Sequence, residues 1–163
     1  MSLAILVFSD DPKHPTRHAF SGGHFPQGVT YQLIQIHWHW GLNNSVGSDH
    51  LLNGISYPLE LHMVHYNEKY ANMEEALEHP DGMAVNAFLY QVFDFGLNLT
   101  DFLIQLSSKD NPGFNKLMEF VYEISGLDVN HAITNTNDVK LKDFFPIGNN
   151  CRYYFYDVGI YIT

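Results

Sequence analysis

The order of apolar and polar residues predicts a chain built mainly from strands. Residues 31–40 alternate by side-chain type, as a strand does, and residues 55–66 give a second candidate strand. Apolar runs at 3–8 and 82–92 predict two buried strands. The polar, glycine-containing segment 41–53 lies between the first two candidate strands and predicts a loop or hairpin connection.

Other segments predict helices and loops. Asn72 and Glu75 have the spacing of a capping box, which predicts a short helix after them. Apolar residues recur at helical spacing within 111–126 and predict a second helix. The proline-containing stretch 9–28 predicts a loop, and the aromatic-rich stretch 143–163 predicts further strand.

Composition and charge narrow the class of protein. The chain has 163 residues, of which 45% are hydrophobic and 16% charged, and this suits one globular domain. Eighteen acidic and eight basic residues give a net charge of −10, which argues against a nucleic-acid partner. Cys151 is the only cysteine, so an internal disulfide and a thiolate metal cage are excluded.

Features related to location are few. Acidic and amide residues interrupt the long apolar runs, so the sequence predicts no transmembrane helix. The apolar run near the N-terminus is too short for a signal peptide and lacks basic residues before it. Sequons for N-glycosylation occur at Asn43 and Asn98, and with the acidic balance they favour an extracellular over a cytoplasmic location.

The two central strands carry a pattern of histidines that is suited to a metal. Because side chains alternate faces on a strand, Gln35, His37 and His39 share one face, and Glu60 and His62 share a face of the other strand. If the strands pair, three imidazoles can meet at one point, and three neutral imidazoles with an open fourth position are typical of a catalytic zinc site. Gln35 and Glu60 each precede a ligand by two residues, where they can accept its second ring N–H.

The residues alone leave a second interpretation open, because a histidine on a strand is more often a hydrogen-bonded or surface residue than a ligand. The H-x-H and E-x-H patterns become a metal site only if the two strands are neighbours. Five other histidines are interpreted as such ordinary residues: His14, His18, His24, His79 and His131.

Four segments in order along the chain carry the pattern of one family. They are QIHWHWG (35–41), GSDHLLNG (47–54), YPLELHMVHYN (57–67) and HPDGMAV (79–85). These segments resemble the α-class carbonic anhydrases, and the resemblance covers most of residues 20–92 and 109–156. It implies a mixed α+β fold, with a single domain on a large twisted, mostly antiparallel β-sheet and short peripheral helices.

The resemblance also assigns ligands and a reaction. It implies that His37, His39 and His62 bind Zn²⁺, with Gln35 and Glu60 as acceptors for the ligands' second ring nitrogens. The implied reaction is the reversible hydration of carbon dioxide to bicarbonate and a proton. The implied partner is therefore this small-molecule substrate.

Further residues take roles by resemblance alone. Val64 and Val85 align with apolar residues that line the carbon dioxide pocket, and His50 and Tyr156 align with an outer hydrogen-bonding network. Asp49 stands where the family has the glutamate that partners a hydroxide-orienting threonine. Because the aspartate side chain is shorter than glutamate, the resemblance implies that this hydroxide-orienting pair is altered.

Some segments of this sequence depart from the family pattern, so functions other than that of an active enzyme stay open. Residues 1–163 correspond to part of a carbonic anhydrase domain, and the segments 93–107 and 158–163 have no counterpart. One hypothesis is that both segments are translated intron sequence, while alternating side chains in 93–107 would also suit an extra strand. The alternative function is an inactive, carbonic-anhydrase-related binding module that still binds zinc, and a third reading is a zinc-binding chain that does not fold independently.

Overall fold

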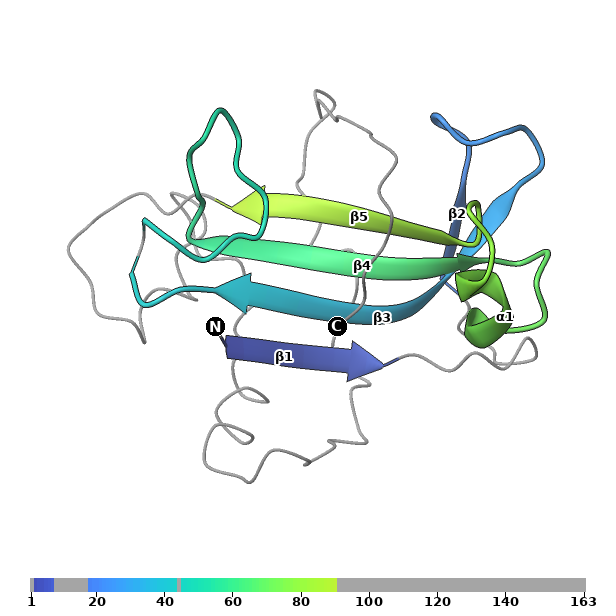
Figure 1. Cartoon of the computed structure of the whole chain (residues 1–163), viewed down its shortest axis with the longest axis horizontal. Coiled ribbons are helices and arrows are strands. Elements are labelled where there is room, and N and C mark those ends of the chain that lie inside the picture. Colours follow the sequence, from blue (N-terminus) through green and yellow to red (C-terminus); the bar gives the residue numbers. More distant parts are fainter. Residues whose placement is uncertain (1, 8–17, 44, 91–163) are drawn as a thin grey trace. The chain divides into compact units, whose positions relative to one another are not determined.

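Strands dominate the part of the chain that the structure describes, which is residues 2–7, 18–43 and 45–90 of a computed structural model. The elements in chain order are β1 (Ser2–Val7), β2 (Ala19–Ser21), β3 (Thr30–Trp40), β4 (Leu59–Asn67), α1 (Met73–Leu77) and β5 (Met83–Tyr90). The sheet order is β1-β3-β4-β5, with β2 paired antiparallel to β3. Neighbouring arrows run in opposite directions (Figure 1), so the predicted α+β fold on a mostly antiparallel sheet with short helices is confirmed.

The described residues belong to two compact units. One unit contains residues 2–39 and 60–89, with most of the sheet and α1, and the other contains residues 40–59 and Tyr90. The predicted helix at 111–126 and the strand-like segments 93–107 and 143–163 lie outside the described residues. Within the described ranges, no helix has the length and apolar character needed to cross a membrane.

The adjacent strands β3 and β4 supply most of the buried side chains. Ile36 and Leu61 are fully buried, and Trp38 is almost so. Each such side chain contributes about 1.5–3 kcal/mol by leaving water. Gln35 and His37, on the opposite face of β3, stay partly exposed, as the alternation predicts.

The predicted start of the second central strand at residue 55 is wrong, because β4 begins at Leu59. Ile55 instead pairs with Leu52 through two backbone hydrogen bonds of 3.0 and 3.1 Å. Asn53 and Gly54 lie between them with φ of 54° and 78°, the backbone of a two-residue hairpin turn for which Asn-Gly is the favoured sequence. The apolar Ile55 therefore ends a tight hairpin.

The short strand β2 lies inside the stretch 9–28, for which the sequence predicted a loop. Ala19 pairs with Gln32 and Ser21 with Thr30. The ring of Phe20 packs against neighbouring aromatic rings, stacking on Tyr31 at 5.6 Å between centroids. Three residues are too few to show a strand period, so this pairing depends on tertiary contacts that the local pattern does not contain.

The predicted short helix after the capping box is present as α1. The Asn72 side chain accepts a hydrogen bond of 2.9 Å from the Glu75 N–H, as a capping box requires. The reciprocal bond is shifted by one residue, because Glu75 Oε2 accepts from the N–H of Ala71 at 2.8 Å. Ala76 is fully buried and belongs to an apolar cluster with Ile34 of β3 and Val64 of β4.

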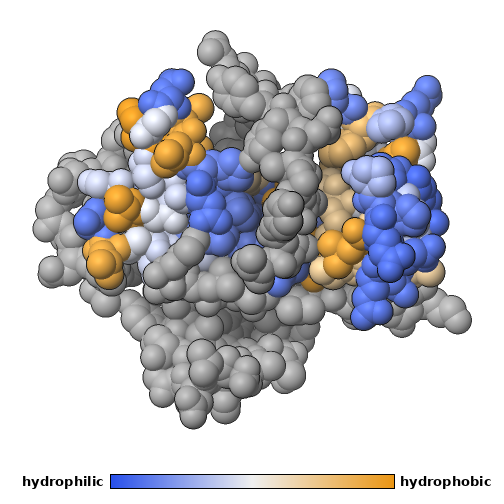
Figure 2. Space-filling view, in the orientation of Figure 1, coloured by the Kyte–Doolittle hydropathy of each residue, from blue (hydrophilic) through white to orange (hydrophobic). Residues whose placement is uncertain are grey.

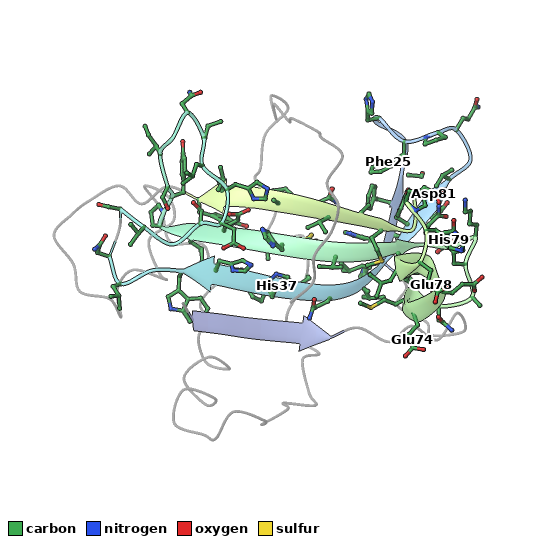
Figure 3. The ribbon with its side chains drawn as sticks, in the orientation of Figure 1. Phe25, His37, Glu74, Glu78, His79 and Asp81 are labelled. Atoms are coloured by element: carbon green, nitrogen blue, oxygen red, sulfur yellow. The ribbon has the colours of Figure 1, made fainter. Side chains whose placement is uncertain are left out.

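The turn between α1 and β5 is fixed to the end of β4 through Asp81 (Figure 3). Its carboxylate accepts hydrogen bonds from Lys69 Nζ at 2.5 Å and the Tyr70 hydroxyl at 2.6 Å, and these donors lower the pKa of Asp81. Its backbone carbonyl accepts from the Tyr31 hydroxyl at 3.0 Å and Asn67 Nδ2 at 3.1 Å. The exposed ion pair contributes little stability. The two part-buried hydrogen bonds to the Asp81 carbonyl therefore do more to hold the turn that leads into β5.

Gly82 in this turn cannot accept a side chain. A Cβ at this position would lie 1.6 Å from the carbonyl oxygen of Ala76, so the backbone would have to move. We expect Gly82→Ala to lower the free energy of unfolding by about 1–3 kcal/mol, the usual cost of overpacking. Urea denaturation followed by circular dichroism measures this change.

A glycine with open surroundings serves as the control for that substitution. Gly22 has a φ of 86° and no atom within 4 Å of a Cβ, and asparagine tolerates this backbone conformation. Gly22→Asn is expected to leave the unfolding midpoint nearly unchanged. Equal stability of Gly82→Ala and the wild type would show that the turn does not pack as described.

Candidate metal centre

Three histidine side chains from β3 and β4 meet at one point, and Figure 3 shows His37 on β3 beside β4. His37 Nε2 and His39 Nε2 each lie 3.2 Å from His62 Nδ1. One nitrogen from each ring lies within 4.8 Å of the others, a spacing that could hold a metal ion. The pairing of β3 with β4, which the sequence left open, brings the H-x-H and E-x-H residues together.

The contact of His62 with Glu60 determines which nitrogen of the neutral His62 ring carries the proton. The Glu60 carboxylate is fully buried, and its Oε1 lies 2.7 Å from His62 Nε2. A carboxylate only accepts hydrogen bonds, so Nε2 of His62 carries the proton. In the neutral ring, Nδ1 then carries the lone pair, and this is the nitrogen that faces His37 and His39.

The spacing of the three nitrogens fits a tetrahedral zinc ion. Zinc–nitrogen bonds of about 2.0–2.1 Å at tetrahedral angles place the ligand nitrogens about 3.3 Å apart. The separations from His62 Nδ1 to His37 Nε2 and to His39 Nε2 are both 3.2 Å in the structure. Three imidazoles without a thiolate suit zinc and other borderline metals better than calcium or magnesium.

The burial of the three rings differs and leaves one side of the centre accessible. His39 is 8% exposed and belongs to the buried core, whereas His37 and His62 are partly exposed. A metal held by these rings would be supported from the sheet and approached from the opposite side. The partial exposure of His37 and His62 is compatible with a fourth coordination position open to water.

The remaining predicted residues of the sheet differ in burial. Gln35 is partly exposed on β3, two residues before His37. Val64 is 6% exposed and belongs to an apolar cluster that includes Ile34 and Tyr66. Val85 on β5 is 41% exposed. The pocket roles of Val64 and Val85 and the acceptor role of Gln35 stay predictions.

The predicted residues outside the sheet lie on the segment 40–59 or beyond the described residues. Asp49 is exposed and His50 partly buried. Ser48 organises this loop, because its hydroxyl donates to the His50 carbonyl at 2.7 Å and accepts from the Tyr57 N–H at 2.8 Å. Tyr156 lies outside the described residues, and the roles of all three predicted residues stay predictions.

His65 is a buried titratable residue that the sequence interpretation did not single out. It is 5% exposed, and the ring of Phe20 meets it edge-on at 4.6 Å. Burial lowers the pKa of His65 to about 4, while backbone groups of Met63 and Ala84 partly oppose the shift. Its place on the β4 face opposite His62 was visible in the alternation, but its burial depends on the packing of β2 and β5.

This burial makes the stability of the chain sensitive to acid. The ordinary pKa of histidine is 6.5, so between pH 6.5 and about 4 the unfolded chain binds more protons at His65 than the folded chain. The contribution of the neutral, buried His65 to the free energy of unfolding is therefore fully present above pH 6.5. It is lost as the pH falls from 6.5 towards 4. We expect His65 to contribute a loss of about 3 kcal/mol across this window.

Urea unfolding at several pH values, in the presence of a chelator, measures this contribution. The His65→Gln variant is expected to show a shallower fall in stability between pH 6.5 and 4 than the wild type. The matched control is His79→Gln, because His79 is exposed and stacks on Tyr70 at the surface. Identical pH profiles for the wild type and His65→Gln would contradict the burial of a neutral His65.

The amino-acid sequence matches a known protein family. The eukaryotic-type carbonic anhydrase family matches residues 5–160. Because this range covers nearly the whole chain, the chain belongs to the eukaryotic-type carbonic anhydrase family.

Particular relatives are found among carbonic anhydrases 6 and 3. Carbonic anhydrase 6 of Canis lupus familiaris is 39% identical over 106 residues, which is 63% of this chain and 31% of the relative. Carbonic anhydrase 6 of Bos taurus is 32% identical over 138 residues, 83% of this chain and 38% of the relative. Carbonic anhydrase 3 of Sus scrofa is 46% identical over 69 residues, 42% of this chain and 26% of the relative. The chain thus spans well under half the length of these relatives.

Some predictions stay open after these comparisons. The matched range runs across 93–107 and ends inside 158–163, but it gives only the two ends of the match. The predicted departures from the family in these two segments therefore stay predictions. The names of the relatives carry no location, so the predicted extracellular location also stays a prediction.

Proposed function

We propose that this chain binds one zinc ion through His37, His39 and His62 and that the zinc-bound chain takes part in the reversible hydration of carbon dioxide. The observation that carries the proposal is the convergence of His37 Nε2 and His39 Nε2 on His62 Nδ1, from which each lies 3.2 Å away. Membership of the carbonic anhydrase family supports the choice of zinc and of the reaction.

The ligand set determines what the metal can do. Zinc held by three neutral imidazoles keeps its full charge, and it lowers the pKa of water bound at the open position to about 7. His39, the most buried ligand, holds the centre against the sheet, while the partly exposed His37 and His62 leave an approach for a small substrate.

Two residues near the ligands orient the His62 ring or supply an apolar surface. Glu60 accepts the Nε2–H of His62, which fixes the tautomer and the orientation of the ring and raises its basicity toward the metal. Val64 follows His62 by two residues on β4, which places it on the same face of the strand by alternation. We propose that its apolar side chain forms part of the wall against which carbon dioxide, a small molecule without hydrogen-bond donors, would bind.

A stopped-flow assay of carbon dioxide hydration tests the proposed reaction. The purified chain, loaded with one equivalent of zinc, is expected to accelerate hydration above the buffer rate, and a sulfonamide is expected to suppress the acceleration. The control is His79→Ala, which removes an exposed imidazole outside the centre and should keep the wild-type rate. Stoichiometric zinc with no acceleration would refute the reaction and favour the zinc-binding, inactive module.

A further inference from the structure

The segment 40–59 contains an N-glycosylation sequon that lies on a tight turn. The sequon contributes no residue to the proposed zinc centre. Asn43 and Ser45 are separated by one residue that is not proline. Asn43 forms a bridge with Val46, whose N–H donates to the Asn43 carbonyl at 3.4 Å. Gly41 makes the turn possible, because a Cβ there would lie 2.0 Å from the Val46 carbonyl oxygen.

The acceptor side chain is presented to solvent on this turn. Asn43 and Ser45 are both exposed. Asn43 Oδ1 accepts a hydrogen bond of 2.9 Å from the Ser45 N–H, which forms an Asx turn and orients the amide group. Among the described residues, none is hydrogen-bonded to Asn43 Nδ2, the atom to which a sugar would be attached. A large group on this nitrogen would therefore displace no packed side chain of the described turn.

The surface beside the turn exposes apolar side chains to solvent. Leu42 is 90% exposed and Val46 is 46% exposed, and both adjoin the sequon. Figure 2 shows hydrophobic surface at the end of the view where the loop lies in Figure 1. Further exposed apolar side chains of the same segment are Leu51, Leu52 and Ile55. A bulky, solubilising glycan at Asn43 would shield Leu42 and Val46, which are close to it in the sequence.

We propose that Asn43 is an N-glycosylation site, modified when the chain enters a secretory compartment. An oligosaccharide is transferred from a lipid-linked diphosphate donor to Asn43. A bond forms between Nδ2 and the anomeric carbon, the bond from that carbon to the diphosphate oxygen breaks, and the amide nitrogen loses one proton as the lipid diphosphate leaves. This modification is independent of the zinc centre.

The test is expression of the full chain behind a cleavable secretion leader in eukaryotic cells, followed by intact-mass measurement with and without an N-glycosidase. The wild type is expected to carry a glycan at position 43, and enzymatic removal should leave an aspartate there. Asn43→Gln and Ser45→Ala are expected to lose this glycan. Ser45→Ala keeps the backbone N–H that Asn43 accepts, so it alters the sequon without altering the turn.

Two further variants make the result specific. Ser45→Thr preserves the sequon and is expected to keep the glycan. Asn98→Gln removes the other sequon and is expected to leave the glycan at Asn43 in place. Wild-type protein in the secretory compartment with an unmodified Asn43 would overturn the proposal, whether or not Asn98 is modified. Zinc content of Asn43→Gln should equal that of the wild type, so this proposal and the zinc proposal can fail separately.

Discussion

Replacing His62 by alanine is expected to abolish stoichiometric zinc binding and, with it, any acceleration of carbon dioxide hydration. His62 Nδ1 lies 3.2 Å from a nitrogen of each of the other two rings, so it is the ligand that links β4 to β3. Loss of a residue that merely orients a ligand weakens metal affinity about 10–100-fold. Loss of one of three ligands is expected to exceed this range. Competition with a chromophoric chelator measures the affinity.

The control for this substitution separates loss of a ligand from loss of a histidine. His79→Ala removes an exposed imidazole that stacks on Tyr70 at 4.2 Å between centroids. Its zinc stoichiometry and affinity should equal those of the wild type. Circular dichroism of apo His62→Ala should match that of the apo wild type, which shows that the sheet is retained. Wild-type zinc affinity in folded His62→Ala would rule out the proposed ligand set.

Replacing Glu60 by glutamine is expected to weaken zinc binding about 10–100-fold without abolishing it. The Glu60 carboxylate is fully buried and lies 2.7 Å from His62 Nε2. A glutamine oxygen can still accept the Nε2–H, but the neutral amide donates no negative charge to the ring and so makes Nδ1 a weaker ligand. The amide group also brings two N–H donors into a buried site that held none.

The matched control for Glu60→Gln is the same change at the surface. Glu78 is exposed at the end of α1 (Figure 3), so Glu78→Gln changes the net charge equally without touching the centre. Its zinc affinity is expected to equal that of the wild type. A Glu60→Gln affinity equal to that of Glu78→Gln would show that Glu60 does not orient His62.

The central strands could be predicted from sequence because their side chains obey a simple period. Thr30–Trp40 was placed to within one residue, and the faces of Gln35 and His37 followed from alternation. The start of β4 could not be placed, since Ile55 and Leu59 are both apolar and only the Asn-Gly hairpin turn between Leu52 and Ile55 distinguishes them.

Some features of the metal centre could likewise be predicted from the sequence, and others could not. Alternation predicted which histidines share a face, but the pairing of β3 with β4 and the 3.2 Å separations of the nitrogens are tertiary properties. The tautomer of His62 could be assigned only from its contact with Glu60 in the folded structure. The network around Asp81 was missed because its donors come from Tyr31, Asn67 and other distant positions that no local pattern connects.

The most direct test of the zinc proposal is X-ray absorption at the zinc edge, measured on the chain loaded with one equivalent of zinc. We expect four-coordinate zinc with three imidazole ligands at about 2.0–2.1 Å and one further oxygen ligand. In His62→Ala this spectrum should disappear, and in His79→Ala it should be unchanged. A six-coordinate oxygen shell, a sulfur ligand, or protein that stays metal-free with zinc in excess would contradict the proposed centre.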